Sequence, residues 1–402
     1  MISYNEAVKS IEKEFNTIIT DIEEIPLEMA SQRTLAENVY ADVNLPPFDN
    51  SAVDGIAIKF NKDITKWNII GEISAGNFSE FDFNDNSAVS IMTGSKIPEF
   101  CDTIIPVEDI ILYKQSATIK DQVKIKTGMN IRRMGSDIKS GELVLPENIL
   151  LKSRHLAAAA SCGKSVLKVL SPLQIAVLAT GDELIDVSEK PENDKIRVSN
   201  TYALCSGIKE LNQSPLNLGF IKDNRELIKL RLRKVLSSDV NILITTGGVS
   251  VGKFDYVKDL FKELGVKEIF WRANIKPGKP AFFGIFEVNN KKKLIFGLPG
   301  NPVSSLVNFE IYIKPFILKM YGMGKIEKVS AFLENDLNKR DNKRHFMKAY
   351  LQEDGGGRYH VTSHISQSSG NLVELSKANC LIEIDEEKLN PRKGETVTCI
   401  KI

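Results

Sequence analysis

Residues 240–256 read VNILITTGGVSVGKFDY, and this stretch decides the fold class. The run 240–246 is apolar and rich in β-branched residues, which is typical of a buried strand. Two adjacent glycines, Gly247 and Gly248, end the run, and a helical pattern covers 256–264. A strand that ends in a glycine turn and leads into a helix predicts one unit of a parallel α/β sheet.

The same alternation recurs on both sides of this stretch. Apolar runs end in polar or glycine-rich turns at QIAVLATGDEL (174–184), SPLNLGFIKDN (214–224) and KLIFGLPGNP (293–302). Helical patterns follow these runs at 201–211, 225–236 and 303–320. Strands that alternate with helices of about 10–15 residues predict a doubly wound parallel sheet. We place this α/β domain at residues 171–323.

The rest of the chain follows other patterns, so we predict a multidomain α/β plus β protein. Short β-like runs broken by Gly, Asn and Asp fill residues 45–145 and predict an inserted β-rich domain. Residues 1–44 and 146–170 flank it as a helical and linker region. Its signals are a capping box at Ser3 and Glu6 and helical patterns over 28–37 and 151–160. Residues 324–402 return to short strands and predict a small C-terminal domain resembling a β-barrel.

Composition excludes several classes of protein. The chain has 402 residues, of which 42% are hydrophobic and 26% charged, as in ordinary globular proteins. The formal net charge of +1 gives no global attraction to nucleic acid or to an acidic membrane. No apolar stretch approaches the ~20 residues of a membrane span, and no signal peptide is visible. Five scattered cysteines without a CxxC pair favour a cytoplasmic protein with reduced thiols.

The turns that end the predicted strands are the first candidate site. Ligands of open parallel sheets bind outside the carboxyl ends of the strands, where glycines let backbone N–H groups approach a phosphate. Acidic residues converge on the same edge, and because they would repel a phosphate, they favour a bridging Mg²⁺. The residues assigned to substrate here are Thr180, Gly181, Asp182, Gly247, Gly248 and Ser250. Those assigned to Mg²⁺ are Asp182, Glu183, Asp223 and Asp255, of which Asp255 also suits the cap of the following helix.

Two basic segments favour anion binding. IKPGKP (275–280) sets Lys276 and Lys279 each directly before a proline, with Arg272 just upstream, and this concentration of charge suits a phosphate or an oxyanion. NIRRMGSDI (130–138) similarly sets Arg132 beside a glycine turn and Asp137.

Several common enzyme motifs are missing. The glycine turns match neither GxGxxG nor the P-loop, which disfavours a Rossmann dinucleotide fold and a Walker ATPase. Ser250 lies in GGVSVG without a histidine nearby in the sequence, which disfavours an acyl-transfer triad.

In GLPGNP, Pro302 suits the first turn of a helix, with Asn301 as its cap.

Seven motifs occur in one order along essentially the whole chain: LPPFDNSAVDGIA (45–57), SIMTGSKIP (90–98), NIRRMGSDI, ATGDEL (179–184), TTGGVSVGKFDY (245–256), IKPGKP and GLPGNPVSSL (297–306). In this order the chain resembles the molybdopterin molybdenumtransferase (MoeA) family, whose eukaryotic counterpart is the E domain of gephyrin. The resemblance implies that the α/β domain at 171–323 is of the molybdopterin-binding type. The resemblance implies an enzyme that takes adenylylated molybdopterin and molybdate, inserts the metal at the dithiolene sulfurs and releases AMP with the help of Mg²⁺. Hydrolysis of the adenylate anhydride needs charge neutralisation and a positioned water more than a protein nucleophile.

By this resemblance, Asp54 is the critical acid that reaches the active cleft from the β-rich domain. Other positions that match functional positions of the family are Thr93, Asp137, Glu183, Asp223, Asp255, Lys276, Lys279, Pro299 and Pro302, while Arg272 replaces a usual lysine. The chain departs from the family at Met134, Ser136 and Asn224. Two assignments stay open: Ser368 or Ser369 as a substrate contact, and Lys348 or Arg344 as a basic site residue.

The resemblance also implies an elongated homodimer in which each cleft uses both subunits, with small-molecule substrates only. Two alternatives stay within the same chemistry, a molybdopterin adenylyltransferase and a tungsten-specific relative, since molybdate and tungstate share size and charge. A third alternative is a non-enzymatic, gephyrin-like scaffold, which would have no need of Asp54 or of the two lysines.

Overall fold

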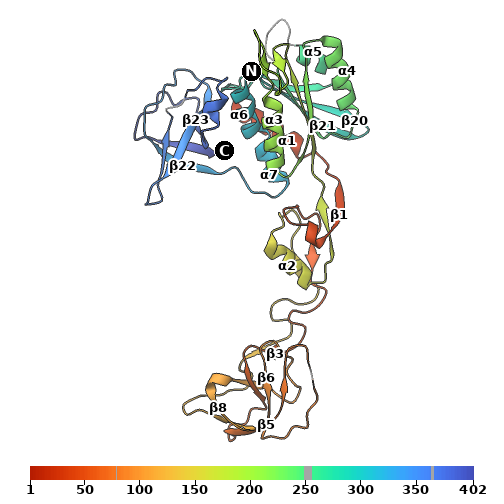
Figure 1. The fold of residues 1–402 in the computed structure, drawn as a ribbon, viewed down its shortest axis with the longest axis vertical. Coiled ribbons are helices and arrows are strands. Elements are labelled where there is room, and N and C mark those ends of the chain that lie inside the picture. Colours follow the sequence, from red (N-terminus) through yellow and green to blue (C-terminus); the bar gives the residue numbers. More distant parts are fainter. Residues whose placement is uncertain (78, 249–255, 364–365) are drawn as a thin grey trace.

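The computed structural model describes residues 1–77, 79–248, 256–363 and 366–402, and the chain is elongated, with its domains arranged along one axis (Figure 1). The β-rich sheet that contains β5 and β6 lies at one end, and the α/β domain lies at the other beside the C-terminal strands. The segment with β1 and α2 connects the two ends.

The central sheet of the α/β domain has the strand order β16-β13-β17-β21-β20-β18. Its strands are β13 (Gln174–Thr180), β16 (Ser214–Ile221), β17 (Ile242–Thr246), β18 (Lys267–Trp271), β20 (Phe282–Val288) and β21 (Lys291–Leu298). From β16 to β21 the pairings are parallel, and β20 and β18 extend the sheet antiparallel. Strands β20 and β21 are antiparallel because a tight hairpin turn at Asn289 and Asn290 joins them. Both residues have the positive φ angles, 51° and 59°, that such a turn requires.

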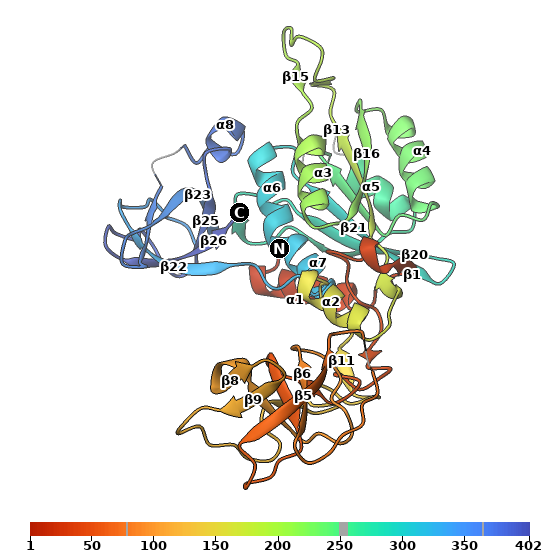
Figure 2. The ribbon, with the colours of Figure 1, turned by 60° about the horizontal axis from the view of Figure 1, so that its bottom comes forward.

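Helices cover both faces of this sheet, which confirms the doubly wound architecture (Figure 2). The helices are α1 (Tyr4–Phe15), α3 (Asn200–Glu210), α4 (Arg225–Leu236), α5 (Tyr256–Glu263), α6 (Pro302–Tyr312) and α7 (Lys314–Met320). Side chains alternate along β13: Ile175 and Val177 pack in one core with α1, α3 and α6, while Ala176 and Leu178 pack in the other with α4 and α5. The predicted capping box of α1 is present at Ser3 and Glu6.

Two predicted helices are wrong. The pattern over 303–320 forms α6 and α7 instead of one helix, because Pro315 has no N–H to continue the ladder and disfavours helical geometry before it. The pattern over 28–37 forms only a 3₁₀ turn (Leu27–Met29), and Thr34 and Leu35 instead make β-bridges to Leu150 and Val169. Tertiary pairing outweighs the weak local helix preference there.

The linker region is a small core crossed by paired strands. Its elements are β1 (Ile22–Pro26), β2 (Val39–Tyr40), β11 (Leu143–Leu145), α2 (Ser153–Ser161) and β12 (Val166–Leu170). Strand β1 pairs with β12 and β2 with β11, so the chain leaves and re-enters this region along two antiparallel ribbons.

Within the inserted domain, the sheet order is β7-β4-β6-β5-β9-β8. Its elements are β3 (Asn50–Ser51), β4 (Gly55–Ile58), β5 (Lys66–Ile73), β6 (Ser87–Ile91), β7 (Thr103–Pro106), a 3₁₀ turn (Val107–Asp109), β8 (Ile110–Tyr113), β9 (Ser116–Ile119) and β10 (Ile131–Arg132).

The C-terminal strands close into a barrel in the order β23-β24-β22-β26-β25, because β25 pairs back with β23. The elements are β22 (Lys328–Leu333), β23 (Arg344–Glu353), β24 (Tyr359–Thr362), the short helix α8 (Leu372–Leu375), β25 (Cys380–Ile384) and β26 (Thr396–Lys401). The short strand β19 (Ile275–Lys276) of the α/β domain pairs with the start of β23. This pairing attaches the barrel to the segment that carries the predicted basic site.

All five cysteines are buried and free. In the described part of the chain, no helix is long and apolar enough to cross a membrane.

Candidate functional site

The strand order places the first candidate site at a topological switch point. Strand β13 lies between β16 and β17, so the chain leaves β13 toward one side and later returns to the other. The crevice beyond the carboxyl ends of β13 and β17 is where open α/β sheets bind ligands. Thr180 ends β13 and Thr246 ends β17, so the TGDEL turn and the glycine turn face each other there.

The glycine turn fits tightly against Thr180. A Cβ added at Gly247 would lie 2.3 Å from the carbonyl oxygen of Thr180, and Gly247 has a φ of +87°. Gly247 N–H also donates to Leu298 O at 3.1 Å, which ties the turn to the end of β21. Only glycine allows this approach of two backbones. Ser250 and Asp255 lie outside the described residues, so their roles stay predictions.

The carboxylates of the TGDEL turn take two different positions. Asp182 and Asp223 are joined by two reciprocal hydrogen bonds. Asp182 N–H donates to Asp223 Oδ2 at 3.3 Å, and Asp223 N–H donates to Asp182 Oδ1 at 3.0 Å. Lys222 donates to the carbonyl oxygen of Asp182 at 3.0 Å. Glu183 instead lies over Gly181 and lines a small cavity. Among residues 1–77, 79–248, 256–363 and 366–402, no three His, Cys, Asp or Glu side chains form a group that could hold a metal ion.

A second cavity, of about 410 Å³, brings together the IKPGKP segment, the start of α6 and the barrel. Lys276 and Lys279 line it and are exposed, and Asn301 and Ser369 also line it. Asn301 is the N-cap residue of α6, as predicted, but its side chain makes no capping hydrogen bond to the described helix start. Val303 N–H donates to Ser369 O at 3.0 Å, so the helix start and the barrel segment are joined directly.

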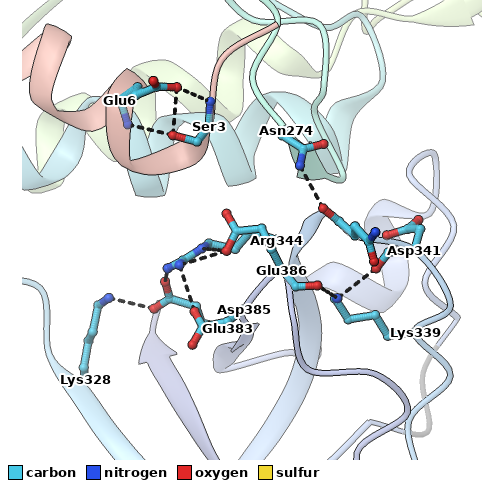
Figure 3. Close-up of polar contacts among 11 residues, drawn as sticks. Ser3, Glu6, Asn274, Lys328, Lys339, Asp341, Arg344, Glu383, Asp385 and Glu386 are labelled. Carbon is cyan, nitrogen blue, oxygen red and sulfur yellow. Dashed lines mark hydrogen bonds and ion pairs between the residues drawn. The ribbon is translucent and has the colours of Figure 1, made fainter.

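Contacts distinguish the two basic residues of β23. The Arg344 guanidinium is engaged by Glu383, Asp385 and Glu386 at 2.7, 2.9 and 3.1 Å (Figure 3). Lys348 is buried, and its ammonium donates to Ser368 O at 3.0 Å. Lys348 is therefore the basic residue in contact with the segment that carries Ser368, while Arg344 belongs to a carboxylate network.

Arg272 is not among the residues that line the lysine cavity. Its guanidinium carbon is 4.0 Å from the centre of the Trp271 ring, and the Lys258 ammonium is 3.5 Å from the same ring. The segment from 272 to 280 thus divides its positive charge between this cation–π cluster and the cavity that Lys276 and Lys279 line.

Sequence reasoning missed a histidine in the lysine cavity. His345 lines it, and His345 Nε2 is 2.7 Å from Asp341 Oδ1. Burial lowers the pKa of His345. Burial opposes ionisation of Asp341 too, but hydrogen bonds from His345 and from the Lys343 N–H outweigh it and lower the pKa of Asp341 to about 2. Only the pairing of β19 with β23 brings His345 beside Lys276, so no local signal in the sequence marked it.

The predicted acid Asp54 lies in the inserted domain together with Thr93. Thr93 donates both its N–H, at 2.7 Å, and its hydroxyl, at 2.8 Å, to Asp54 Oδ1. The Thr93 N–H, and then its hydroxyl, lower the pKa of the exposed Asp54 carboxyl, which is therefore ionised at neutral pH.

The neighbouring NIRRMGSDI segment folds onto the LPPFDN segment through one ion pair and a strand pairing, and a second ion pair lies within the segment. Arg132 pairs with Asp137 at 2.6 Å, and Arg133 pairs with Asp49 at 2.6 Å. Strand β10 pairs with β3, which holds these charges near the start of β4. In the view of Figure 1, the sheet with β5 and β6 and the sheet with β21 lie at opposite ends, so one chain does not bring the two groups of predicted residues together.

Comparison with known proteins matches every part of this architecture. Models of the MoeA N-terminal region (domain I and II), the probable molybdopterin binding domain and the MoeA C-terminal region (domain IV) match residues 2–163, 176–319 and 330–402. A molybdopterin molybdenumtransferase of Haemophilus influenzae is 34% identical over 385 residues, covering 94% of this chain and 93% of its own. The chain belongs to the MoeA family. A Staphylococcus aureus MoeA relative, also named molybdopterin molybdenumtransferase, is 30% identical over 387 residues, covering 94% of this chain and 90% of its own.

The MoeA fold extends over the full length. The crystal structure of a molybdopterin biosynthesis MoeA protein from Pyrococcus horikoshii matches with a TM-score of 0.84 at 26% identity, covering 100% of this chain and 99% of that one. This confirms the family and the multidomain fold predicted from the motifs. The roles of the individual site residues are assigned from their positions in the sequence motifs.

Proposed function

We propose that this MoeA chain is a molybdopterin molybdenumtransferase, which inserts molybdate into adenylylated molybdopterin and releases AMP. The observation that carries the proposal is the lysine cavity: Lys276, Lys279 and the start of α6 line one space beside the switch-point crevice. An oxyanion held by two lysines in that cavity would lie next to a substrate whose phosphates occupy the glycine turn.

In this proposal the protein contributes charge and position instead of a nucleophile. Lys276 and Lys279 neutralise molybdate, and N–H groups near Gly247 hold the pyrophosphate of the adenylate. Asp182 and Asp223 set two carboxylates side by side at the crevice, where each accepts the other's backbone N–H. Mg²⁺ is commonly bound by one or two carboxylates plus substrate phosphates, and this pair fits that role. Bound there, Mg²⁺ would neutralise the leaving AMP.

We also propose a homodimer in which each active cleft uses both subunits. Asp54 and Thr93 lie in the inserted domain, away from the crevice of their own chain, and an elongated partner is the source that can supply them. The buried, free cysteines and the near-zero net charge support a cytoplasmic enzyme that acts on small molecules.

The decisive experiment mixes purified protein, adenylylated molybdopterin, molybdate and Mg²⁺, and measures AMP and metallated pterin by chromatography. AMP release that depends on molybdate is expected. Absence of molybdate-dependent AMP release would refute the proposed function, and a release that is faster with tungstate would reassign the metal.

A further inference from the structure

His345 stands in the wall of the lysine cavity, next to Lys276. It lines this cavity together with Lys276 and Lys279, and it is only 2% exposed. In the parallel pairing of β19 with β23, Lys276 is the partner of His345, so the two side chains lie on the same face of the sheet. Histidine is the side chain that ordinarily changes its charge between about pH 5 and 8. The charge of this cavity wall can therefore change near neutral pH.

Positive charge dominates the surroundings of His345. The charged side chains that lie beside it or line the same cavity come from β19, from the turn after β19 and from the segment before β23: Lys276, Lys279, Lys339, Asp341 and Lys343. Strand β25, on the other side of β23, places the apolar Ile384 opposite His345. Burial lowers the pKa of His345, the contact with Asp341 opposes this shift, and the Lys276 and Lys339 ammonium groups add to it. The imidazole of the free protein is therefore neutral at neutral pH.

The hydrogen bond to Asp341 decides which nitrogen of the ring can take up a proton. His345 Nε2 is 2.7 Å from Asp341 Oδ1. The pKa of Asp341 is lowered to about 2, so this carboxylate is ionised at neutral pH and can only accept a hydrogen bond. Nε2 therefore carries the hydrogen of the neutral ring, and Nδ1 carries none. A proton that the ring takes up adds at Nδ1, and the hydrogen bond from Nε2 to Asp341 is kept.

We propose that the lysine cavity binds its oxyanion together with a proton, which adds to His345 Nδ1. This inference rests on the proposed function, in which Lys276 and Lys279 hold molybdate. A dianion between the two ammonium groups offsets their charge and adds negative charge beside the ring, so it favours the imidazolium form. Linkage is reciprocal, so the imidazolium favours the anion to the same extent. The cavity then holds molybdate more tightly as the pH falls through the titration of His345, and less tightly as the pH rises.

Calorimetric titration counts this proton directly. Molybdate is titrated into the wild-type protein at about pH 6.5 in two buffers of different ionisation enthalpy, and the difference between the two heats gives the number of protons taken up per anion bound. We expect about half a proton or more for the wild type and close to none for His345→Gln, whose amide does not titrate. The affinity of the wild type for molybdate should fall about fivefold or more between about pH 5.5 and 7.5, whereas that of His345→Gln should change by less than about twofold.

Two further variants locate the anion and the proton. Lys276→Ala should weaken molybdate binding by about tenfold or more, which places the anion in the lysine cavity. His360→Gln is the matched control, because His360 is a histidine of the same barrel that lines a different cavity, with Glu334 and Asp354. Its proton uptake on binding molybdate should equal that of the wild type.

Circular dichroism of every variant shows whether it is folded, and His345→Asn replaces His345→Gln if the latter is not. Binding of molybdate without proton uptake by the wild type, or no binding at millimolar concentration, would overturn the inference, and neither result depends on a variant. Wild-type proton uptake in folded His345→Gln, or unweakened binding in Lys276→Ala, would also overturn it. AMP release by the wild type is measured separately, so a protein that releases AMP but takes up no proton with molybdate refutes only this inference.

Discussion

Replacing Asp54 by Asn should remove the carboxylate charge while leaving the structure of the inserted domain intact. Thr93 directs both its donors at one oxygen, Asp54 Oδ1. The amide oxygen of the substituted side chain can accept the same two hydrogen bonds, so the midpoint of thermal unfolding should change by only about 2 °C or less. If the ionised carboxylate acts in the reaction, AMP release should fall by about 10²-fold or more, the usual scale for a positioned charge or acid–base group.

The assay measures molybdate-dependent AMP release together with pterin binding and thermal unfolding of the same preparation. Pterin affinity should stay at the wild-type level, because the crevice proposed to bind the substrate lies in the α/β domain. Turnover within about threefold of wild type would remove Asp54 from the mechanism. A drop in stability that parallels the loss of turnover would show that the carboxylate is structural.

The same variant tests the shared cleft. Lys276→Ala and Asp54→Asn chains should each be inactive, yet dimers exchanged from an equal mixture should regain about a quarter of wild-type activity. Half of such dimers are mixed, and each mixed dimer has one intact cleft if the two residues come from different subunits. No recovery in a mixture shown to exchange subunits would place both residues in clefts of a single chain.

Other predictions address the glycine turn, acid stability and the metal. Gly247→Ala should destabilise the fold by about 2 kcal/mol or more in chemical denaturation, since its φ of +87° is strained for alanine and its Cβ would lie 2.3 Å from Thr180 O; wild-type stability would contradict the tight turn. The pKa of Asp341 is lowered in the fold, so the stability it contributes is present above about pH 4 and is lost as the pH falls toward about 2. Asp341→Asn should therefore make the free energy of unfolding less dependent on pH in that window. If the variant keeps the pH dependence of the wild type, the His345 contact does not lower the pKa of Asp341. Chelation should abolish AMP release until Mg²⁺ is restored, and Asp182→Asn should raise the Mg²⁺ concentration needed at half-maximal rate; activity in full chelator would exclude the metal.

Local patterns determined the elements whose own residues stabilise them. The helix over 225–236 was predicted with the bounds that α4 has, because Asn224 caps it and its apolar side chains share one face. The meeting of the strand-end turns at one sheet edge also followed from sequence, because it is a property of alternating strands and helices. The strand order that puts the switch point beside β13 came from the structure. The helix over 28–37 failed because Thr34 and Leu35 pair with Leu150 and Val169, which lie far along the chain.

The candidate cavities depend on contacts that no local pattern encodes. Arg344 and Lys348 occupy one strand, and only their neighbours, a carboxylate group for one and the Ser368 backbone for the other, separate their roles. The sequence by itself therefore determined the family, the domains' architecture and the residues that carry charge. The tertiary structure decided which of these charges share a cavity, because that depends on strand pairings between segments far apart in the chain.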